Sequence, residues 1–182
     1  MLIYTSFTPG YDAERDDILQ WPAKVLMDVK INKICPHEFF EDVVLRDEII
    51  VWVDGNIYLT ADNLAEIEAQ LKTADIVVMT HPHRNCIYDE AAFCIEHGIG
   101  DRSEIERQVA VYRSKRYPEN AGLYGCGVIA RRHTDRINQL CEEWFWHVVE
   151  YSKRDQISFP FVFRGVKIGT IHFESVEIRP HL

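Results

Sequence analysis

The stretch Ile49-Ile50-Val51-Trp52-Val53 is wholly apolar and lies between the acidic pair Asp47-Glu48 and the polar segment Asp54-Gly55-Asn56. A short apolar run with polar ends is typical of a β-strand that is buried on both faces. Residues 75–80 (DIVVMT) have the same character. We therefore predict that these two runs form the centre of a sheet, and that the polar residues after each run carry the chemistry.

Strand-like runs and helical periodicities alternate on both sides of this centre. Further strands are predicted at 2–7, 123–130, 166–171 and 176–178, and helices at 62–72, 86–97, 102–113, 134–151 and 155–163. Such alternation predicts an α/β fold, with a Rossmann-like, mostly parallel central sheet flanked by helices. The chain has 182 residues and no repeat or linker, so we expect a single domain over 1–182.

Composition excludes several classes of protein. The net charge of −9 argues against nucleic acid as a partner. No segment approaches the roughly 20 apolar residues that span a bilayer. Residues 1–11 are too short and too polar for a secretory signal, so we expect a cytoplasmic protein. Five cysteines without a Cys-x-x-Cys motif argue against a disulfide framework and against a structural zinc site.

The first candidate site is the segment directly after the 49–53 strand. Asp54 stands at the carboxyl end of the strand, Gly55 allows a sharp exit, and Asn56 adds a second oxygen donor. Carboxylate and amide oxygens suit Mg²⁺ or Mn²⁺, and such an ion could stabilise a diphosphate as a leaving group. The alternative is that Asp54 and Asn56 only form an Asx turn.

Two further segments combine charged and polar side chains. His81, His83 and Arg84 follow the 75–80 strand and could face a phosphate or a metal, or serve only in a turn. Asp155 and Gln156 follow the long 134–151 helix. They could hold sugar hydroxyls, with Asp155 accepting a proton, or they could simply begin a helix.

Smaller signals lie elsewhere in the chain. Lys33-Ile34-Cys35-Pro36-His37 places a cation and a histidine beside a proline-directed turn, and His172 falls on a late strand. A lone histidine is more often structural than a ligand. The aromatic run Trp144-Phe145-Trp146 is expected in the core, although one indole could stack on a sugar ring.

These segments, taken in order, resemble one family. It is the glycosyltransferase-like family once filed as a domain of unknown function, which includes plant mucilage-related and tapetum-defective proteins. The matching pieces are Lys33-Ile34-x-Pro36-His37, Trp52-Val53-Asp54-Gly55-Asn56-Ile57, His81-Pro82-x-Arg84-x-Cys86-Ile87-Tyr88-x-Glu90-Ala91, Gln108-x-x-x-Tyr112, Arg131-x-His133-Thr134 and Arg154-Asp155-Gln156-x-Ser158-Phe159. They run from about residue 30 to residue 162.

The resemblance implies a glycosyltransferase fold of the A type, with an acidic metal hook after a central strand. It implies that Asp54 anchors the metal and the diphosphate, with Asn56 in place of the usual second acid. A late histidine often completes the metal site in this fold, which points to His172 first and His181 second. The implied cofactors are Mn²⁺ or Mg²⁺ and a nucleotide-sugar donor, for which we expect UDP.

The resemblance also assigns the rest of the donor site. Thr5, Ser6 and Tyr11 would lie near the nucleoside. Asp155 and Gln156 would face the transferred sugar or the acceptor.

The phosphates of the donor would be faced by Lys33, His81 and Arg84. The expected reaction is transfer of a sugar, as by a hexosyltransferase, from a nucleoside diphosphate to a hydroxyl of a glycan or another acceptor.

Two other functions stay open at this point. One is a metal-dependent hydrolase that would use Asp54, His81, His83 and His172. The other is a non-catalytic module that binds carbohydrate or nucleotide and has lost the donor site.

Overall fold

The structure, a computed structural model, describes residues 1–7, 15–23, 26–40 and 47–179. Its strands are β1 (Leu2–Phe7), β2 (Leu19–Pro22), β3 (Ile49–Val53), β4 (Ile57–Tyr58), β5 (Ile76–Thr80), β6 (Tyr124–Arg132), β7 (Ile168–Ile171) and β8 (Glu177–Ile178). Its helices are α1 (Leu26–Ile34), α2 (His37–Phe40), α3 (Ala61–Gln70), α4 (Ile87–Glu96), α5 (Arg102–Ser114), α6 (Asp135–Glu150) and α7 (Asp155–Val162), followed by a 3₁₀ turn at Phe173–Ser175.

The central sheet has the strand order β2-β1-β3-β6-β5-β7. Strand β6 runs antiparallel to both of its neighbours, β3 and β5, whereas the other neighbouring pairs are parallel. The carboxyl ends of β1, β3, β5 and β7 therefore meet at one edge, together with the amino end of β6. This arrangement confirms the predicted α/β fold with a mostly parallel sheet flanked by helices.

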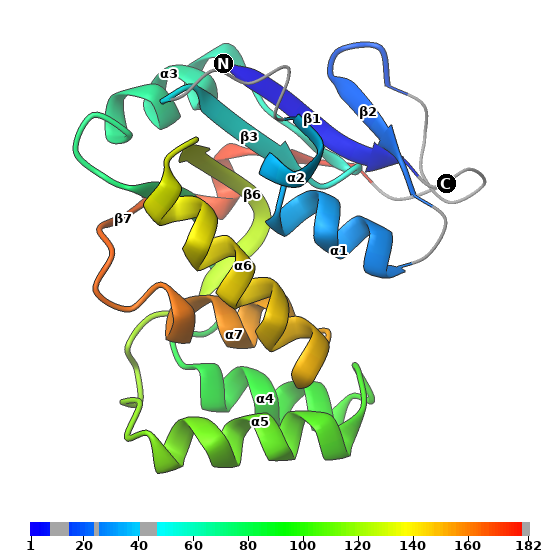
Figure 1. Ribbon diagram of the computed structural model, residues 1–182, viewed down its shortest axis with the longest axis vertical. Helices are drawn as coiled ribbons and strands as arrows, with labels where there is room; N and C mark the ends of the chain where they lie inside the picture. Colours follow the sequence, from blue (N-terminus) through cyan, green and yellow to red (C-terminus); the bar gives the residue numbers. More distant parts are fainter. Residues whose placement is uncertain (8–14, 24–25, 41–46, 180–182) are drawn as a thin grey trace.

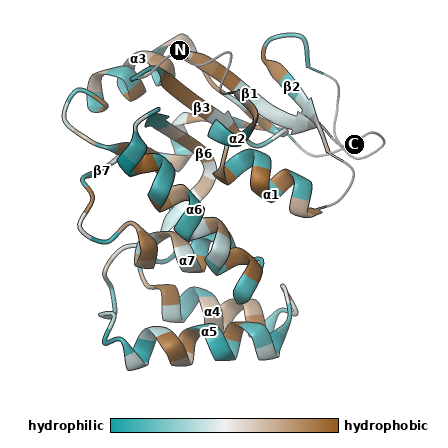
Figure 2. Cartoon of the chain, in the orientation of Figure 1, coloured by the Kyte–Doolittle hydropathy of each residue, from teal (hydrophilic) through white to brown (hydrophobic). Residues whose placement is uncertain are grey.

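Side chains of β3 alternate between two cores. Ile50 and Trp52 pack with the large cluster beneath α1, α6 and α7, while Val51 and Val53 pack on the opposite face with Ile67 of α3. Because both faces are covered, each residue of the strand is apolar. Figure 1 shows α4 and α5 as a further layer beyond α7, and Figure 2 shows β3 in mainly hydrophobic colours.

Helix α3 begins one residue before the predicted range, because Thr60 is its N-cap. Its hydroxyl accepts a hydrogen bond from the backbone N–H of Asn63 at 3.2 Å, and the Asn63 side chain accepts one from the backbone N–H of Thr60 at 2.9 Å. This reciprocal capping box satisfies two N–H groups that the helix itself leaves free.

Strand β7 is protected by a side chain from α3. The Gln70 amide accepts a hydrogen bond from the Thr170 N–H at 2.8 Å and donates one to the Thr170 carbonyl at 2.6 Å. Gly169 leaves room for this contact, because a Cβ there would lie 2.4 Å from the Gln70 oxygen.

No helix in the described part of the chain is long and apolar enough to cross a membrane.

Candidate active site

A tight turn after β3 presents Asp54 at the shared edge of the sheet. The Ile57 N–H bonds to the Asp54 carbonyl at 2.9 Å, and the Asp54 N–H bonds to the Gly127 carbonyl at 2.7 Å. The backbone thus closes the turn, with Gly55 and Asn56 at its tip. Neither carboxylate oxygen of Asp54 caps an N–H of the turn among the described residues, so the Asx-turn alternative does not account for this side chain.

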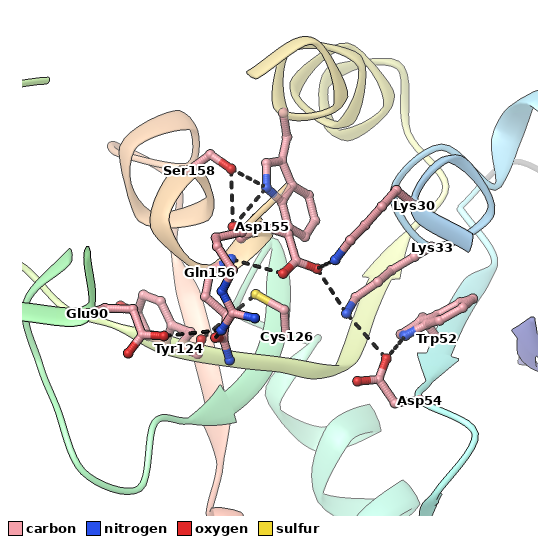
Figure 3. Close-up of polar contacts among 12 residues, drawn as sticks. Lys30, Lys33, Trp52, Asp54, Glu90, Tyr124, Cys126, Asp155, Gln156 and Ser158 are labelled. Carbon is pink, nitrogen blue, oxygen red and sulfur yellow. Dashed lines mark hydrogen bonds and ion pairs between the residues drawn. The ribbon is translucent and has the colours of Figure 1, made fainter. Parts of the chain in front are cut away.

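The two carboxylate oxygens of Asp54 have different surroundings. Oδ1 accepts a hydrogen bond from the Trp52 indole at 2.7 Å and lies 3.2 Å from the ammonium of Lys33 (Figure 3). Oδ2 has no hydrogen-bond partner in the part of the chain that the structure describes. The side chain is 40% exposed. One oxygen is therefore held in place while the other stays free for a ligand.

A cavity of about 250 Å³ opens beside Asp54. Asn56, His81 and Gln156 also line it, so four of the predicted site residues share one cavity. Gly127 on β6 makes room for it, because a Cβ there would lie 3.2 Å from Asp54 Oδ2. The remaining lining residues are Ile57, Met79, Pro82, Gly125, Phe173 and Ile178.

Asp155, the first residue of α7, lies behind this cavity in a buried charge cluster. Its Oδ2 is 2.9 Å from Lys30 Nζ and 3.0 Å from Lys33 Nζ, and its Oδ1 accepts a hydrogen bond from the Gln156 N–H at 3.1 Å (Figure 3). Burial alone would raise the pKa of Asp155, but the two ammonium groups outweigh it and hold the pKa well below its ordinary range. Asp155 is thus a paired carboxylate at neutral pH.

Lys33 lies between Asp155 and Asp54. Burial alone would lower the pKa of Lys33, but the carboxylates of Asp155 and Asp54 raise it above its ordinary value. The predicted contact of Lys33 with a phosphate stays a prediction. In the structure the ammonium group instead orients Asp54, which is a role that sequence reasoning missed.

The side chain of Gln156 is oriented by a second buried network. Arg154 Nη2 donates to Gln156 Oε1 at 2.9 Å and to Glu90 Oε1 at 3.2 Å. Glu90, only 2% exposed, also accepts a 2.7 Å hydrogen bond from Arg84 Nε. The Gln156 oxygen is thus occupied, its amide nitrogen is left as a donor, and the residue lines the cavity.

His81 is fixed by the turn that follows β5. Its Nδ1 accepts hydrogen bonds from the backbone N–H groups of His83 at 3.3 Å and Arg84 at 3.0 Å. The proton of the ring therefore sits on Nε2, which lies 3.6 Å from Glu90 Oε2. Burial lowers the pKa of His81, so a neutral ring lines the cavity.

Arg84 and His172 lie outside the set that lines the cavity. Arg84 is bound to Glu90, and its guanidinium stacks over Phe93 at 3.9 Å. His172 is exposed just after β7, at the same edge of the sheet, and its neighbour Phe173 lines the cavity instead. The roles predicted for these two side chains, toward phosphate and metal, stay predictions.

The residues predicted near the nucleoside lie at the end of β1. Thr5 and Ser6 are buried, and Ser6 Oγ accepts a hydrogen bond from the Asn32 side chain at 2.9 Å. Tyr11, and the second candidate for the late metal ligand, His181, fall outside the described residues.

Several residues that shape the site were missed at the sequence level. Lys30 precedes Lys33 by three positions on α1, a spacing that places both on one helix face, so this signal was available. Trp52 precedes Asp54 by two positions and shares its face of the strand. Glu90 and Arg154 were noted only as parts of matching motifs, because no local pattern predicts that they meet.

The donor set for a metal is incomplete without outside ligands. Within the described part of the chain, Asp54 belongs to no group of three histidine, cysteine or carboxylate ligand atoms that lie within 4.8 Å of one another. A divalent ion here would take Asp54 Oδ2 and the amide oxygen of Asn56, and would draw its other ligands from phosphate and water.

Comparison with known proteins identifies the family of the chain. The chain is 28% identical over 144 residues to the probable hexosyltransferase MUCI70 of Arabidopsis thaliana, an alignment that covers 73% of this chain and 24% of the relative. The aligned part is thus only about a quarter of that relative's length. No solved structure matches the chain. The model of the TOD1/MUCI70 glycosyltransferase-like domain matches residues 23–178, and the chain therefore belongs to the TOD1/MUCI70 glycosyltransferase-like family.

Proposed function

We propose that this protein is a glycosyltransferase that moves a hexosyl group from a nucleoside diphosphate, UDP in the first instance, to a hydroxyl of an acceptor such as a glycan. One observation carries the proposal. Asp54 holds a carboxylate oxygen that no described residue binds, beside a cavity that Asn56, His81 and Gln156 also line. Family membership and the hexosyltransferase relative support the same chemistry.

The residues present fit a divalent ion. Asp54 Oδ2 is unoccupied by any described side chain, and Asn56 lines the same cavity, so two hard oxygen donors are available. When bound, Mg²⁺ or Mn²⁺ would neutralise the growing charge on the leaving diphosphate. Trp52 and Lys33 fix the other oxygen of Asp54, so the carboxylate is oriented before any ligand arrives.

The chain's polar groups would hold the sugar around the reacting centre. The Gln156 amide nitrogen can donate to a sugar hydroxyl, and Arg154 keeps the amide in that orientation. In the proposed reaction the acceptor hydroxyl bonds to the anomeric carbon while the bond from that carbon to the diphosphate oxygen breaks, and the hydroxyl proton is released to the departing diphosphate or to water. Positioning of the two reactants supplies much of such a rate enhancement.

Asp155 was expected to accept the proton of the attacking hydroxyl, and that role stays a prediction. The structure favours a positioning role. The carboxylate is buried, bound to two lysines, and its pKa lies well below the ordinary range, so its affinity for a proton is low. Through Lys33 it helps to set the orientation of Asp54, and through the Gln156 N–H it holds the first turn of α7.

Nucleotide binding tests the proposal directly. We expect UDP or a UDP-sugar to raise the thermal unfolding temperature of the wild-type protein, and to do so more strongly with Mn²⁺. Asp54→Asn should abolish this shift, whereas Asp62→Asn, on the exposed side of α3, should retain it. Equal shifts in the wild type and Asp54→Asn for every nucleotide and metal would contradict the proposed donor site.

The same purified protein and variants distinguish the other two functions from the proposed one. The hydrolase alternative needs Asp54, His81, His83 and His172 to converge, yet His83 and His172 are exposed and do not line the cavity. Release of free sugar without any acceptor would nevertheless support it. Nucleotide binding without any sugar transfer would identify a binding module instead.

A further inference from the structure

A second group of ligand-type side chains lies away from the proposed active site, between α2 and α6. His37 and Glu38 begin α2, and Glu142 projects from α6. His37 Nε2 lies 3.3 Å from Glu142 Oε1 and 3.7 Å from Glu38 Oε1. Within the described residues, this is the group of three histidine, cysteine or carboxylate ligands whose atoms all lie within 4.8 Å of one another.

The spacing of these atoms matches a tetrahedral ion. A zinc ion with nitrogen and oxygen ligands at about 2.0–2.1 Å places neighbouring donor atoms about 3.3–3.5 Å apart. The two distances from the His37 nitrogen, 3.3 and 3.7 Å, fall at or close to that range. The donors come from two helices that meet only through folding, so the site would be assembled by the tertiary structure.

The negative charges of Glu38 and Glu142 also favour a bound cation. Every ion pair recorded for Glu38 and Glu142 among the described residues is with the His37 ring. An imidazole offers at most one proton at Nε2, which cannot serve two carboxylates at once.

Burial holds the His37 ring in place. The side chain is 8% exposed and its Nδ1 atom is buried, so Nε2 is the ring nitrogen that faces Glu38 and Glu142.

We propose that His37, Glu38 and Glu142 form a Zn²⁺ site whose fourth position is taken by water. One imidazole with carboxylates suits zinc, and three protein ligands plus water is a common zinc arrangement. The cysteine pattern argued against a structural zinc site, but this set contains no cysteine. The ion would tie α2 to α6 and so fix the end of α1, which carries Lys30 and Lys33.

The test is zinc binding to the full chain after treatment with a chelator, measured by calorimetry or by competition with a zinc indicator. We expect one high-affinity Zn²⁺ per chain and a rise in the thermal unfolding temperature when it binds. Glu142→Gln and Glu38→Gln should each weaken binding on the order of 100-fold or more, since they remove a direct ligand. Both side chains are exposed, so these variants should fold normally.

Glu143→Gln is the matched control, because Glu143 is exposed on the same helix next to Glu142. It should bind zinc with the wild-type affinity and show the same thermal shift. Asp54→Asn should also leave this zinc affinity unchanged, which separates the site from the proposed donor site. Absence of zinc binding, wild-type affinity in Glu142→Gln, or loss of binding in Asp54→Asn would each overturn the proposal.

Discussion

Lys33 Nζ lies 3.0 Å from Asp155 Oδ2, and both side chains are almost fully buried, with 6% and 7% of their surface exposed. The same ammonium group lies 3.2 Å from Asp54 Oδ1. A single buried cation thus joins the first residue of α7 to the carboxylate at the tip of β3. Stability of the fold and geometry of the proposed donor site therefore depend on the same contact.

Replacing Lys33 with methionine should destabilise the protein strongly. The change removes the charge but retains most of the stem, and it leaves two carboxylates that have lost a partner. Breaking a buried ion pair from one side costs about 3–5 kcal/mol in the free energy of unfolding. Because Lys30 still pairs with Asp155, we expect a loss of about 3 kcal/mol. Urea unfolding monitored by tryptophan fluorescence measures it.

The control for Lys33→Met is Lys153→Met, because Lys153 is exposed near the same end of α7. That change should alter the free energy of unfolding by less than about 0.5 kcal/mol. If Lys33→Met changed the free energy of unfolding as little as Lys153→Met does, the buried ion pair would contribute little to the stability of the fold.

The pH dependence of stability should reveal the paired state of Asp155. The pKa of Asp155 is lowered in the folded protein, so its contribution is fully present above the unfolded pKa of about 3.9 and is lost progressively as the pH falls from there through the much lower folded pKa. The wild type should exceed Asp155→Asn in stability at pH 5–8, by about 2–3 kcal/mol. Below pH 4 this gap should begin to narrow, because the unfolded chain then takes up a proton at Asp155 that the folded protein does not.

Urea midpoints of both proteins between pH 3 and pH 8 measure this narrowing. Asp62→Asn, which changes an exposed carboxylate, provides the reference for the general effect of acid on the fold. A gap between the wild type and Asp155→Asn that stays constant down to pH 3 would show that the benefit of Asp155 is not electrostatic.

The centre of the sheet and the place of Asp54 could be predicted from the sequence, since they depend on local patterns. A wholly apolar run such as 49–53 is compatible with few structures other than a strand covered on both faces. The residue after such a strand must emerge at the sheet edge, whatever the rest of the chain does. The same reasoning placed His81 at the cavity.

The partners of those residues could not be predicted, because they depend on segments that only the fold brings together. Arg84 follows a strand as His81 does, yet the buried carboxylate of Glu90 binds it away from the cavity. The contact of Lys33 with a phosphate stays a prediction, and nothing local in the sequence predicts its contacts with Asp54 and Asp155. A single sequence shows which charges exist, but it does not show which opposite charge a buried side chain will meet.

The contact between Gln70 and strand β7 yields a prediction about the sheet edge. Gln70→Ala removes both hydrogen bonds to the backbone of Thr170, which β7 cannot replace on that side. We expect a loss of about 1–3 kcal/mol in the free energy of unfolding, together with faster aggregation of the exposed edge. Chemical unfolding and light scattering at elevated temperature measure the two effects.

Glu68→Ala, on the exposed face of the same helix, is the control for Gln70→Ala. It should leave both measurements unchanged within about 0.5 kcal/mol. Wild-type stability of Gln70→Ala would mean that water satisfies the backbone of Thr170 as well as the side chain does.

Gly127 yields a prediction about the cavity itself. An added Cβ would lie 2.6 Å from Ile57 Cδ1, 2.9 Å from Met79 Cε and 3.2 Å from Asp54 Oδ2. The first two atoms end flexible side chains, so they can move, but both side chains line the cavity and would move into it. Gly127→Ala should therefore cost only about 1 kcal/mol in stability. The Kd for the nucleotide should rise about tenfold, the equivalent of about 1.4 kcal/mol.

Gly125→Ala is the control that distinguishes loss of space in the cavity from the general effect of replacing a glycine on β6. Gly125 lies on the same strand and lines the same cavity, yet a Cβ there would be 3.4 Å from the nearest Met79 atoms, an ordinary contact. Calorimetric titration should give a nucleotide Kd for Gly125→Ala within about twofold of the wild type. If Gly127→Ala bound as tightly as Gly125→Ala, the space beside Asp54 Oδ2 would not be where the diphosphate sits, and the donor would have to be placed elsewhere along the sheet edge.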